Sequence, residues 1–224
     1  LSHNTGLVVI PTYNPTPRLA NLIEILDKTL PHDFGILIVD DHSPQFTKLV
    51  GEISWVATNS KKVIYILKQE SNLGFVKNVN TVFENISGLD IILCNSDVLP
   101  ARNWFPGLFL AAKSSNLVAT ATAVTNFGSI ATVEFPSNSQ DLLATLDILG
   151  TSSQAERKTF PTLPTCVGHF VYFNAVALAS VGCFDETFSP GYGEEVDWSQ
   201  RAISLGFRHV LAIERHRRQI PLEL

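Results

Sequence analysis

The sequence predicts an α/β protein built on a largely parallel sheet. Two observations lead to this class. Short apolar runs alternate with segments of helical periodicity, and acidic or turn residues stand where several of the runs end. With 45% hydrophobic and 17% charged residues, the 224-residue chain has ample apolar material for a core. Its length fits one large domain, which we expect to span residues 1–224.

Strands and helices are expected to alternate along the first half of the chain. We predict strands at 7–10, 36–39, 63–67, 91–94 and 118–124, with helices at 18–30, 47–56, 75–86 and 104–114. This order favours two or three right-handed βαβ units. From residue 125 to 165 the pattern weakens into a Ser/Thr/Asn/Pro-rich stretch with one helical patch at 142–149, and loops this long are usually functional or mobile. Regular structure returns at 167–173, 175–181 and 194–205.

Charge and cysteine content exclude several classes of protein. The net charge is −5, and no stripe of Lys and Arg with interleaved aromatic residues is visible, which argues against nucleic-acid binding. The one basic cluster, at 215–218, is typical of a solvated tail that could touch anionic lipid. Three cysteines without metal or redox spacing, and no apolar run of transmembrane length, favour the cytoplasm. We expect a cytoplasmic protein with peripheral contact at the inner face of the cell membrane.

Polar motifs follow the predicted strands at 7–10, 36–39 and 91–94. They are Pro11–Asn14, the pair Asp40 and Asp41, and the segment Asn95–Asp97. In an open α/β sheet, ligands bind beyond the carboxyl ends of the strands. We therefore expect these motifs, remote in the chain, to converge on one site.

Each strand-end motif has a chemical interpretation and a simpler one. Asp41 could accept the imide N–H of a uracil or thymine ring, because an ionised carboxylate only accepts hydrogen bonds; helix capping explains one Asp but not the pair. Tyr13 could stack on a base or belong to an ordinary turn. Asp97 could bind a divalent cation together with phosphate oxygens, or form an Asx turn.

Two further motifs precede predicted helices. Asn72-Leu73-Gly74 is expected to present free backbone N–H groups, with Lys77, to a diphosphate, although an Asn cap with a turn Gly is the simpler interpretation. In the run 191–197 (GYGEEVD), the glycines allow close backbone approach to a ligand, and Glu195 could deprotonate an attacking hydroxyl. Complementing the helix dipole explains one Glu well, but not the whole run.

Taken in order, the segments PTYN, VDDHS, NLGFVKNVN, NSD, CVGHFVYF and FDETFSPGYGEEVDW resemble the inverting family 2 glycosyltransferases, especially bacterial rhamnosyltransferase-like members. The resemblance covers the chain from Val8 to about Leu211. It implies the GT-A fold, a Rossmann-like and mostly parallel central sheet flanked by helices, with a smaller acceptor-side region in the C-terminal half. Residues 1–124 would bind the nucleotide sugar, and residues 125–224 would bind the acceptor and catalyse transfer.

The resemblance also implies a role for each matched position. The nucleotide-binding residues would be Pro11, Tyr13, Asp40, Asp41, Asn72, Gly74 and Lys77, with Asp41 recognising the base. Asp97 matches the last carboxylate of the family's Asp-x-Asp motif and Asn95 its first, which implies Mg²⁺ or Mn²⁺ as cofactor. Glu195 matches the catalytic base and Glu194 its acidic neighbour. The acceptor and sugar pocket would include Gly168, His169, Gly193 and Asp197, although Asp197 is rather expected to stabilise its helix or orient polar groups.

The chain departs from the family pattern in two places. Asn95 can coordinate a metal but carries no charge, so metal affinity is expected to be weaker. The family often supplies a metal-binding His after the strand that 208–211 resembles, and the basic surroundings of His216 do not match it. We therefore expect the C-terminal half to be truncated, and we take the absence of Met to indicate an excised or incompletely represented chain.

The predicted activity is transfer of a sugar, with inversion, from a UDP- or dTDP-sugar to a glycan or lipid-linked acceptor in cell-surface polysaccharide synthesis. The first strand is not followed by G-x-G-x-x-G or by a Gly-rich basic loop, and no P-loop occurs. These absences argue against an oxidoreductase, a nucleotidyltransferase and a P-loop NTPase. The remaining alternative is a non-catalytic or truncated nucleotide-sugar-binding domain, which would keep Asp41 and Asp97 without turnover.

Overall fold

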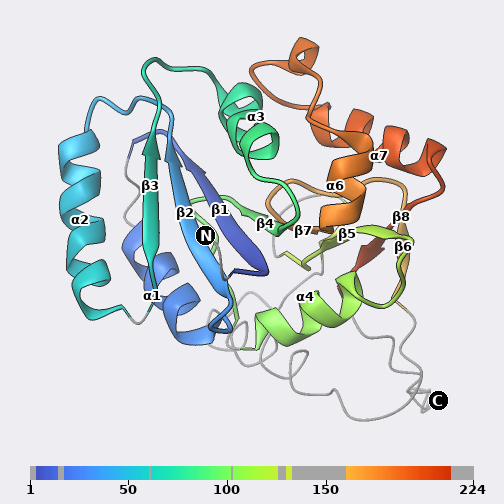
Figure 1. Ribbon diagram of the computed structural model, residues 1–224, viewed down its shortest axis with the longest axis horizontal. Coiled ribbons are helices and arrows are strands. Elements are labelled where there is room, and N and C mark those ends of the chain that lie inside the picture. Colours follow the sequence, from blue (N-terminus) through green and yellow to red (C-terminus); the bar gives the residue numbers. More distant parts are fainter. Residues whose placement is uncertain are drawn as a thin grey trace, which may run out of the picture.

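A single mixed sheet runs through the computed structural model, which describes residues 4–14, 18–60, 62–101, 103–125, 130–132 and 160–212 (Figure 1). The strands are β1 (Gly6–Thr12), β2 (Phe34–Asp40), β3 (Ile64–Lys68), β4 (Asp90–Cys94), β5 (Val118–Thr122), β6 (Thr162–Leu163), β7 (Phe170–Phe173) and β8 (Arg208–Leu211). The helices are α1 (Leu19–Thr29), α2 (Phe46–Asn59), α3 (Phe75–Asn85), α4 (Trp104–Ala112), α6 (Ala175–Val181) and α7 (Glu194–Ser204), with a short 3₁₀ helix at Glu186–Phe188.

The strand order is β3-β2-β1-β4-β7-β5-β8-β6. The first four strands pair in parallel, as the alternation of strands and helices predicted. Strand β7 lies antiparallel between β4 and β5, and β5 pairs in parallel with β8. The predicted α/β class with a mostly parallel sheet flanked by helices is therefore confirmed.

Two details differ from the sequence prediction. The expected irregular stretch 125–165 contains β6, which pairs antiparallel with β8, and the expected strand 167–173 begins only at Phe170. Both follow from pairing with strands remote in the sequence, which local periodicity does not reveal. The predicted helical patch at 142–149, the basic cluster at 215–218 and His216 lie outside the described residues.

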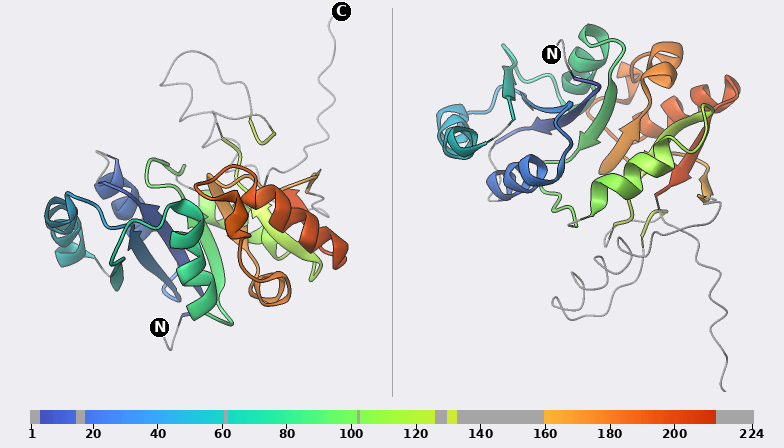
Figure 2. Two further views of the ribbon diagram at one scale, coloured as in Figure 1. Left: turned by 90° about the horizontal axis from the view of Figure 1, so that it is seen from above. Right: turned by 60° about the horizontal axis from the view of Figure 1, so that its bottom comes forward.

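Helices cover both faces of the sheet and give two cores (Figures 1 and 2). Helices α1, α2 and α4 pack on one face, against side chains such as Val8, Ile36 and Ile92. Helices α3, α6 and α7 pack on the other, against Leu7 and Val39. Successive strand residues point to opposite faces, so β1 and β2 are buried along their whole length, as expected for parallel strands covered on both sides. No helix within the described ranges has the length and apolar character needed to cross a bilayer.

Candidate active site

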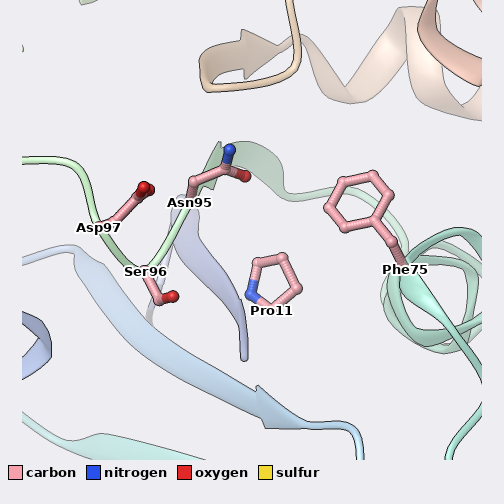
Figure 3. A pocket seen from close by; sticks show the side chains of 5 residues that line it. All are labelled: Pro11, Phe75, Asn95, Ser96 and Asp97. Carbon is pink, nitrogen blue, oxygen red and sulfur yellow. The ribbon is translucent and has the colours of Figure 1, made fainter. Parts of the chain in front are cut away.

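A pocket of about 250 Å³ opens at the carboxyl ends of β1 and β4, beside the start of α3. Its walls come from Pro11, Phe75, Asn95, Ser96 and Asp97. In Figure 3 the rings of Pro11 and Phe75 lie across from one another, and the side chains of Asn95 and Asp97 point to one side while Ser96 points to the other. Apolar rings from β1 and α3 thus share a pocket with oxygen donors from the end of β4.

Asn95 and Asp97 carry the side-chain oxygen atoms in this pocket that could coordinate a metal ion. Asp97 is exposed, and no described residue forms a hydrogen bond or ion pair with its carboxylate; Arg18 Nη1 lies 3.4 Å from its backbone carbonyl oxygen. Within the described ranges, no group of three or more His, Cys, Asp or Glu side chains could hold a metal ion. Two protein oxygens nevertheless suit a Mg²⁺-like ion that completes its shell with substrate phosphates and water. The donor set therefore fits a metal held jointly with a diphosphate.

Asp41 is buried, and both of its carboxylate oxygens are already used. The backbone N–H of Leu73 donates to Oδ1 at 2.6 Å, and that of Gly74 donates to Oδ2 at 2.9 Å. The expectation of free amides in Asn72–Gly74 is therefore wrong for Leu73 and Gly74, because both amides already donate hydrogen bonds to the Asp41 carboxylate. A carboxylate has about four lone-pair sites, so Asp41 can still accept a further donor.

Asp40 joins the ends of β1 and β2. It is fully buried and accepts hydrogen bonds from the backbone N–H of Ser43, at 3.0 Å, and from the Ser43 hydroxyl. The Ser43 Oγ in turn accepts from the backbone N–H of Asn14, at 2.7 Å. Asn14 has a φ of 66°, in the left-handed region where Asn is favoured among non-glycine residues. Asp40 thereby fixes the turn that carries Tyr13, whose side chain is 52% exposed.

The start of α3 meets the loop that precedes α7. Gly74 caps α3 with a φ of 78°, and a Cβ built there would lie 3.6 Å from Ser189 Oγ and 3.9 Å from Pro190 Cα. One turn on, Lys77 Nζ lies 3.5 Å from Glu186 Oε2, and both side chains are about half exposed. The segment bound by Asp41 therefore touches the loop that leads into Glu194 and Glu195.

The two glutamates occupy different environments in the first turn of α7. Glu194 is buried and its Oε2 has no hydrogen-bond partner within the described residues, whereas Glu195 is half-buried and its Oε2 lies 3.4 Å from the backbone N of Gly193. Burial raises the pKa of Glu194, and the neighbouring Glu195 raises it further. Gly193 has a φ of 111°, and a Cβ there would clash with the Phe188 ring at 2.8 Å. Only glycine suits position 193.

A buried polar network, which the sequence did not reveal, fixes α7 to the sheet. His209 on β8 contacts Thr120 Oγ1 through Nδ1 at 2.7 Å and the Ser199 carbonyl through Nε2 at 3.1 Å. Ser199 Oγ donates to the Glu195 carbonyl at 2.6 Å and accepts from the backbone N–H of Cys166 at 3.0 Å. These polar side chains lie inside an apolar core, and no local pattern marks them.

The segment held by this network leads to Gly168 and His169 and then to the pocket. The backbone N–H of Asn95 donates to the His169 carbonyl at 2.9 Å, so His169 lies beside the end of β4. Burial lowers the pKa of the His169 ring, while the Ala123 backbone and Asp97 partly oppose this shift. A Cβ on Gly168 would meet no atom within 4 Å. Gly168 thus borders open space, whereas both ring nitrogens of His169 are buried beside the end of β4 and have no hydrogen-bond partner among the described residues.

Asp197 is engaged elsewhere. Its Oδ2 accepts from Arg201 Nε at 2.8 Å, one turn along α7, and the same guanidinium donates to the carbonyls of Val181 and Cys183 at 2.8 Å. These contacts tie α7 to the end of α6. They provide a helix-stabilising role and leave the Asp197 carboxylate occupied.

The model of the family described as "Glycosyl transferase family 2" matches residues 7–182. Among curated proteins, no sequence matches significantly.

Solved structures with a similar fold include the mannosyltransferase PcManGT from Pyrobaculum calidifontis in complex with GDP-Man and Mn²⁺, with a TM-score of 0.65 and 17% identity over 92% of this chain and 54% of that one. GalNAc-T7 with UDP, GalNAc and Mn²⁺ has a TM-score of 0.69 and 14% identity, over 93% of this chain and 42% of that one. Glucosyl-3-phosphoglycerate synthase from Mycobacterium tuberculosis in complex with UDP has a TM-score of 0.57 and 20% identity, over 99% of this chain and 74% of that one. The chain thus spans about half the length of the first two.

Proposed function

Because the chain belongs to glycosyl transferase family 2, we propose that it transfers a sugar from a nucleoside diphosphate donor to an acceptor hydroxyl, with inversion. One observation carries this proposal. Residues at the ends of β1 and β4 line a pocket together with Phe75, and the loop leading to Glu194 and Glu195 lies beside Gly74, the residue before Phe75. The family match and the likeness to nucleotide-sugar enzymes support it.

The nucleotide would enter between the apolar and acidic parts of the site. Pro11 and Phe75 offer opposed apolar walls, and the exposed Tyr13 offers a ring for stacking. Asp41, with two acceptor sites still unused, would take the imide N–H of a uracil or thymine. The solved relatives hold GDP-Man or UDP, so guanine belongs in the test beside uracil and thymine.

The diphosphate would lie near Asn95 and Asp97. These two residues would hold a divalent cation, which supplies charge compensation for the departing diphosphate when bound. Mn²⁺ accompanies two of the solved relatives, which supports Mg²⁺ or Mn²⁺ here. Lys77, about half exposed, is within the same helix turn as Phe75 and would add positive charge once released from Glu186.

Glu195 would act as the general base. As the acceptor oxygen attacks the anomeric carbon from the face opposite the diphosphate, Glu195 takes its proton, and this single displacement inverts the anomeric configuration. Burial and the neighbouring Glu195 raise the pKa of Glu194, the residue before it. A proton on Glu194 would leave the negative charge of the pair on Glu195, where the base needs it.

The test of the catalytic role is the variant Glu195→Gln. A general base contributes about 10²–10⁴-fold, so turnover should fall by roughly that factor while nucleotide binding persists. Glu52→Gln, on α2 away from the pocket, is the matched control and should retain full turnover. Turnover of Glu195→Gln close to that of the wild type would remove Glu195 from this role.

The donor is best identified by thermal shift with UDP-, dTDP- and GDP-sugars, each with and without Mn²⁺. A ligand at 100 times its dissociation constant stabilises the native state by about 2.7 kcal/mol.

We propose a UDP- or dTDP-sugar donor of the rhamnosyltransferase-like type. The proposed acceptor is a growing cell-surface glycan or lipid-linked saccharide, met at the inner membrane face. The alternative is a nucleotide-sugar-binding domain without turnover, and binding of a nucleotide sugar without any donor hydrolysis would establish it.

A further inference from the structure

Tyr192 is an almost fully exposed aromatic residue in an unfavourable backbone conformation. Its side chain is 97% exposed, and it forms no hydrogen bond, ion pair or ring contact with any described residue. Its φ is 74°, in the left-handed region that bulky residues rarely adopt. Gly191 and Gly193 flank it with φ angles of 156° and 111°. Nothing in the described fold accounts for a tyrosine ring at this position.

The backbone around Tyr192 explains the conformation but not the ring. The amide of Gly193 lies 3.4 Å from Glu195 Oε2, and the amides of Glu194 and Tyr192 oppose part of the rise that burial causes in the pKa of Glu194. The left-handed turn thus directs N–H groups toward the two glutamates. A glycine would serve this purpose with less strain, because it lacks the Cβ that makes the region costly. Strained residues of this kind cluster at functional sites.

The position of Tyr192 relative to Glu195 suggests what the ring could contact. They are three positions apart in the sequence, so their Cα atoms lie no more than about 11 Å apart. An acceptor sugar whose hydroxyl reaches Glu195 would have its ring within range of a side chain placed there. Val196, 45% exposed, adds apolar surface to the same turn. The preceding residues Ser189 and Pro190 lie close to Gly74, which directly precedes the pocket residue Phe75.

We propose that the Tyr192 ring is the platform on which the apolar face of the acceptor sugar stacks, and that it helps to select which acceptor binds. A pyranose has one face lined by C–H groups, which pack on an aromatic ring while its hydroxyls remain hydrated. This inference rests on the proposed function, since it assigns a residue to the acceptor side of the same site. It assigns no role to the phenol hydroxyl.

The proposal is tested by saturation-transfer NMR titrations with methyl α-L-rhamnopyranoside, methyl α-D-glucopyranoside and methyl β-D-galactopyranoside. The wild type should transfer saturation to the ring C–H protons of at least one glycoside. Tyr192→Ala should bind that glycoside roughly tenfold more weakly, the upper range for an aromatic contact, and Tyr192→Phe should bind within about twofold of the wild type. Trp55→Ala, which removes a 69% exposed ring on α2, is the matched control and should change nothing.

Three outcomes would overturn the proposal: no saturation of any glycoside by the wild type, equal binding by Tyr192→Ala, or a loss in Tyr192→Phe as large as in Tyr192→Ala. Tyr192→Gly should unfold at about the same urea concentration as the wild type, since relief of strain and added chain entropy oppose each other; a marked loss of stability would make the ring structural. Thermal shift with UDP and Mn²⁺ separates failure of this inference from failure of the proposed function. Nucleotide binding without a Tyr192-dependent sugar signal refutes this inference alone, whereas a sugar signal without binding of any nucleotide refutes the proposed function.

Discussion

Replacing Asp41 with Ala should destabilise the fold and weaken nucleotide binding together. The Asp41 carboxylate is 5% exposed and accepts the backbone N–H groups of Leu73 and Gly74 at 2.6 and 2.9 Å. Ala cannot accept either bond, so both amides lose their partner. The segment they belong to carries Gly74 into the start of α3 and toward Phe75 in the pocket wall.

The magnitude follows from the two bonds. Hydrogen bonds to a charged group contribute about 1.5–3 kcal/mol each. Leu73 and Gly74 are only half-buried, so water can reach their amides, and the lower end of the range applies. We expect Asp41→Ala to lose about 3 kcal/mol of unfolding free energy, and Asp41→Asn about half of that, because the Asn amide retains one acceptor oxygen.

Urea unfolding followed by far-UV circular dichroism measures this loss, and nucleotide titration follows on the same variants. Asp97→Ala is the matched control for stability: its carboxylate is exposed and has no partner among the described residues, so its unfolding free energy should stay within about 0.5 kcal/mol of the wild type. If Asp41→Ala unfolds within about 0.5 kcal/mol of the wild type, the two bonds contribute little and the reasoning fails.

Three further predictions concern charge. Because the pKa of Glu194 is raised in the folded state, the stability contributed by its protonated form is lost as pH rises through the folded pKa. The unfolding free energy of Glu194→Gln, measured by urea titration, should therefore increase relative to that of the wild type as pH rises from about 4 to 8. A difference between the two proteins that does not change with pH would refute this. Burial lowers the pKa of His209, so wild-type stability should fall as pH drops below about 6.5, with a shallower fall in His209→Gln; equal slopes would contradict it. Asn95→Asp should strengthen Mn²⁺-dependent stabilisation by UDP in thermal-shift assays, and Asp97→Ala should remove it; unchanged Mn²⁺ dependence in both variants would exclude a metal at this position.

The fold was predictable where local pattern and topology agree. Each of the first four strands is an apolar run, and each intervening helix repeats its apolar side chains every three or four residues, as Leu19, Leu22, Ile23 and Leu26 do in α1. Strands β6 and β7 were harder to place. The two residues of β6 become a strand only by pairing with β8, and β7 becomes antiparallel only by entering between β4 and β5.

Of the residues that line the pocket, the sequence pointed to Pro11, Asn95 and Asp97, but it did not reveal the contacts around them. The rule that ligands bind at carboxyl strand ends selects Pro11, Asp41 and Asp97. It does not say that Asp41 already binds two backbone amides, nor that Phe75 forms a pocket wall. Those facts depend on where the chain places the start of α3. The signal for Phe75 lay in the motif itself, since it directly follows Gly74, the helix-capping glycine.

The two halves of the site are held in different ways, and this difference bears on how they would work together. The half that we propose to bind the donor is fixed by the sheet, through Asp40 and the paired strands β1, β2 and β4. The helix that carries Glu195 is fixed independently, through the buried contacts of His209 with Thr120 and Ser199. Between the halves lie the packing of Gly74 on Ser189 and Pro190 and the half-exposed pair of Lys77 with Glu186. An exposed ion pair contributes at most about 1 kcal/mol. A diphosphate that attracts Lys77 would therefore break this link at little cost, and the loop before Glu194 is the element that would respond to the donor.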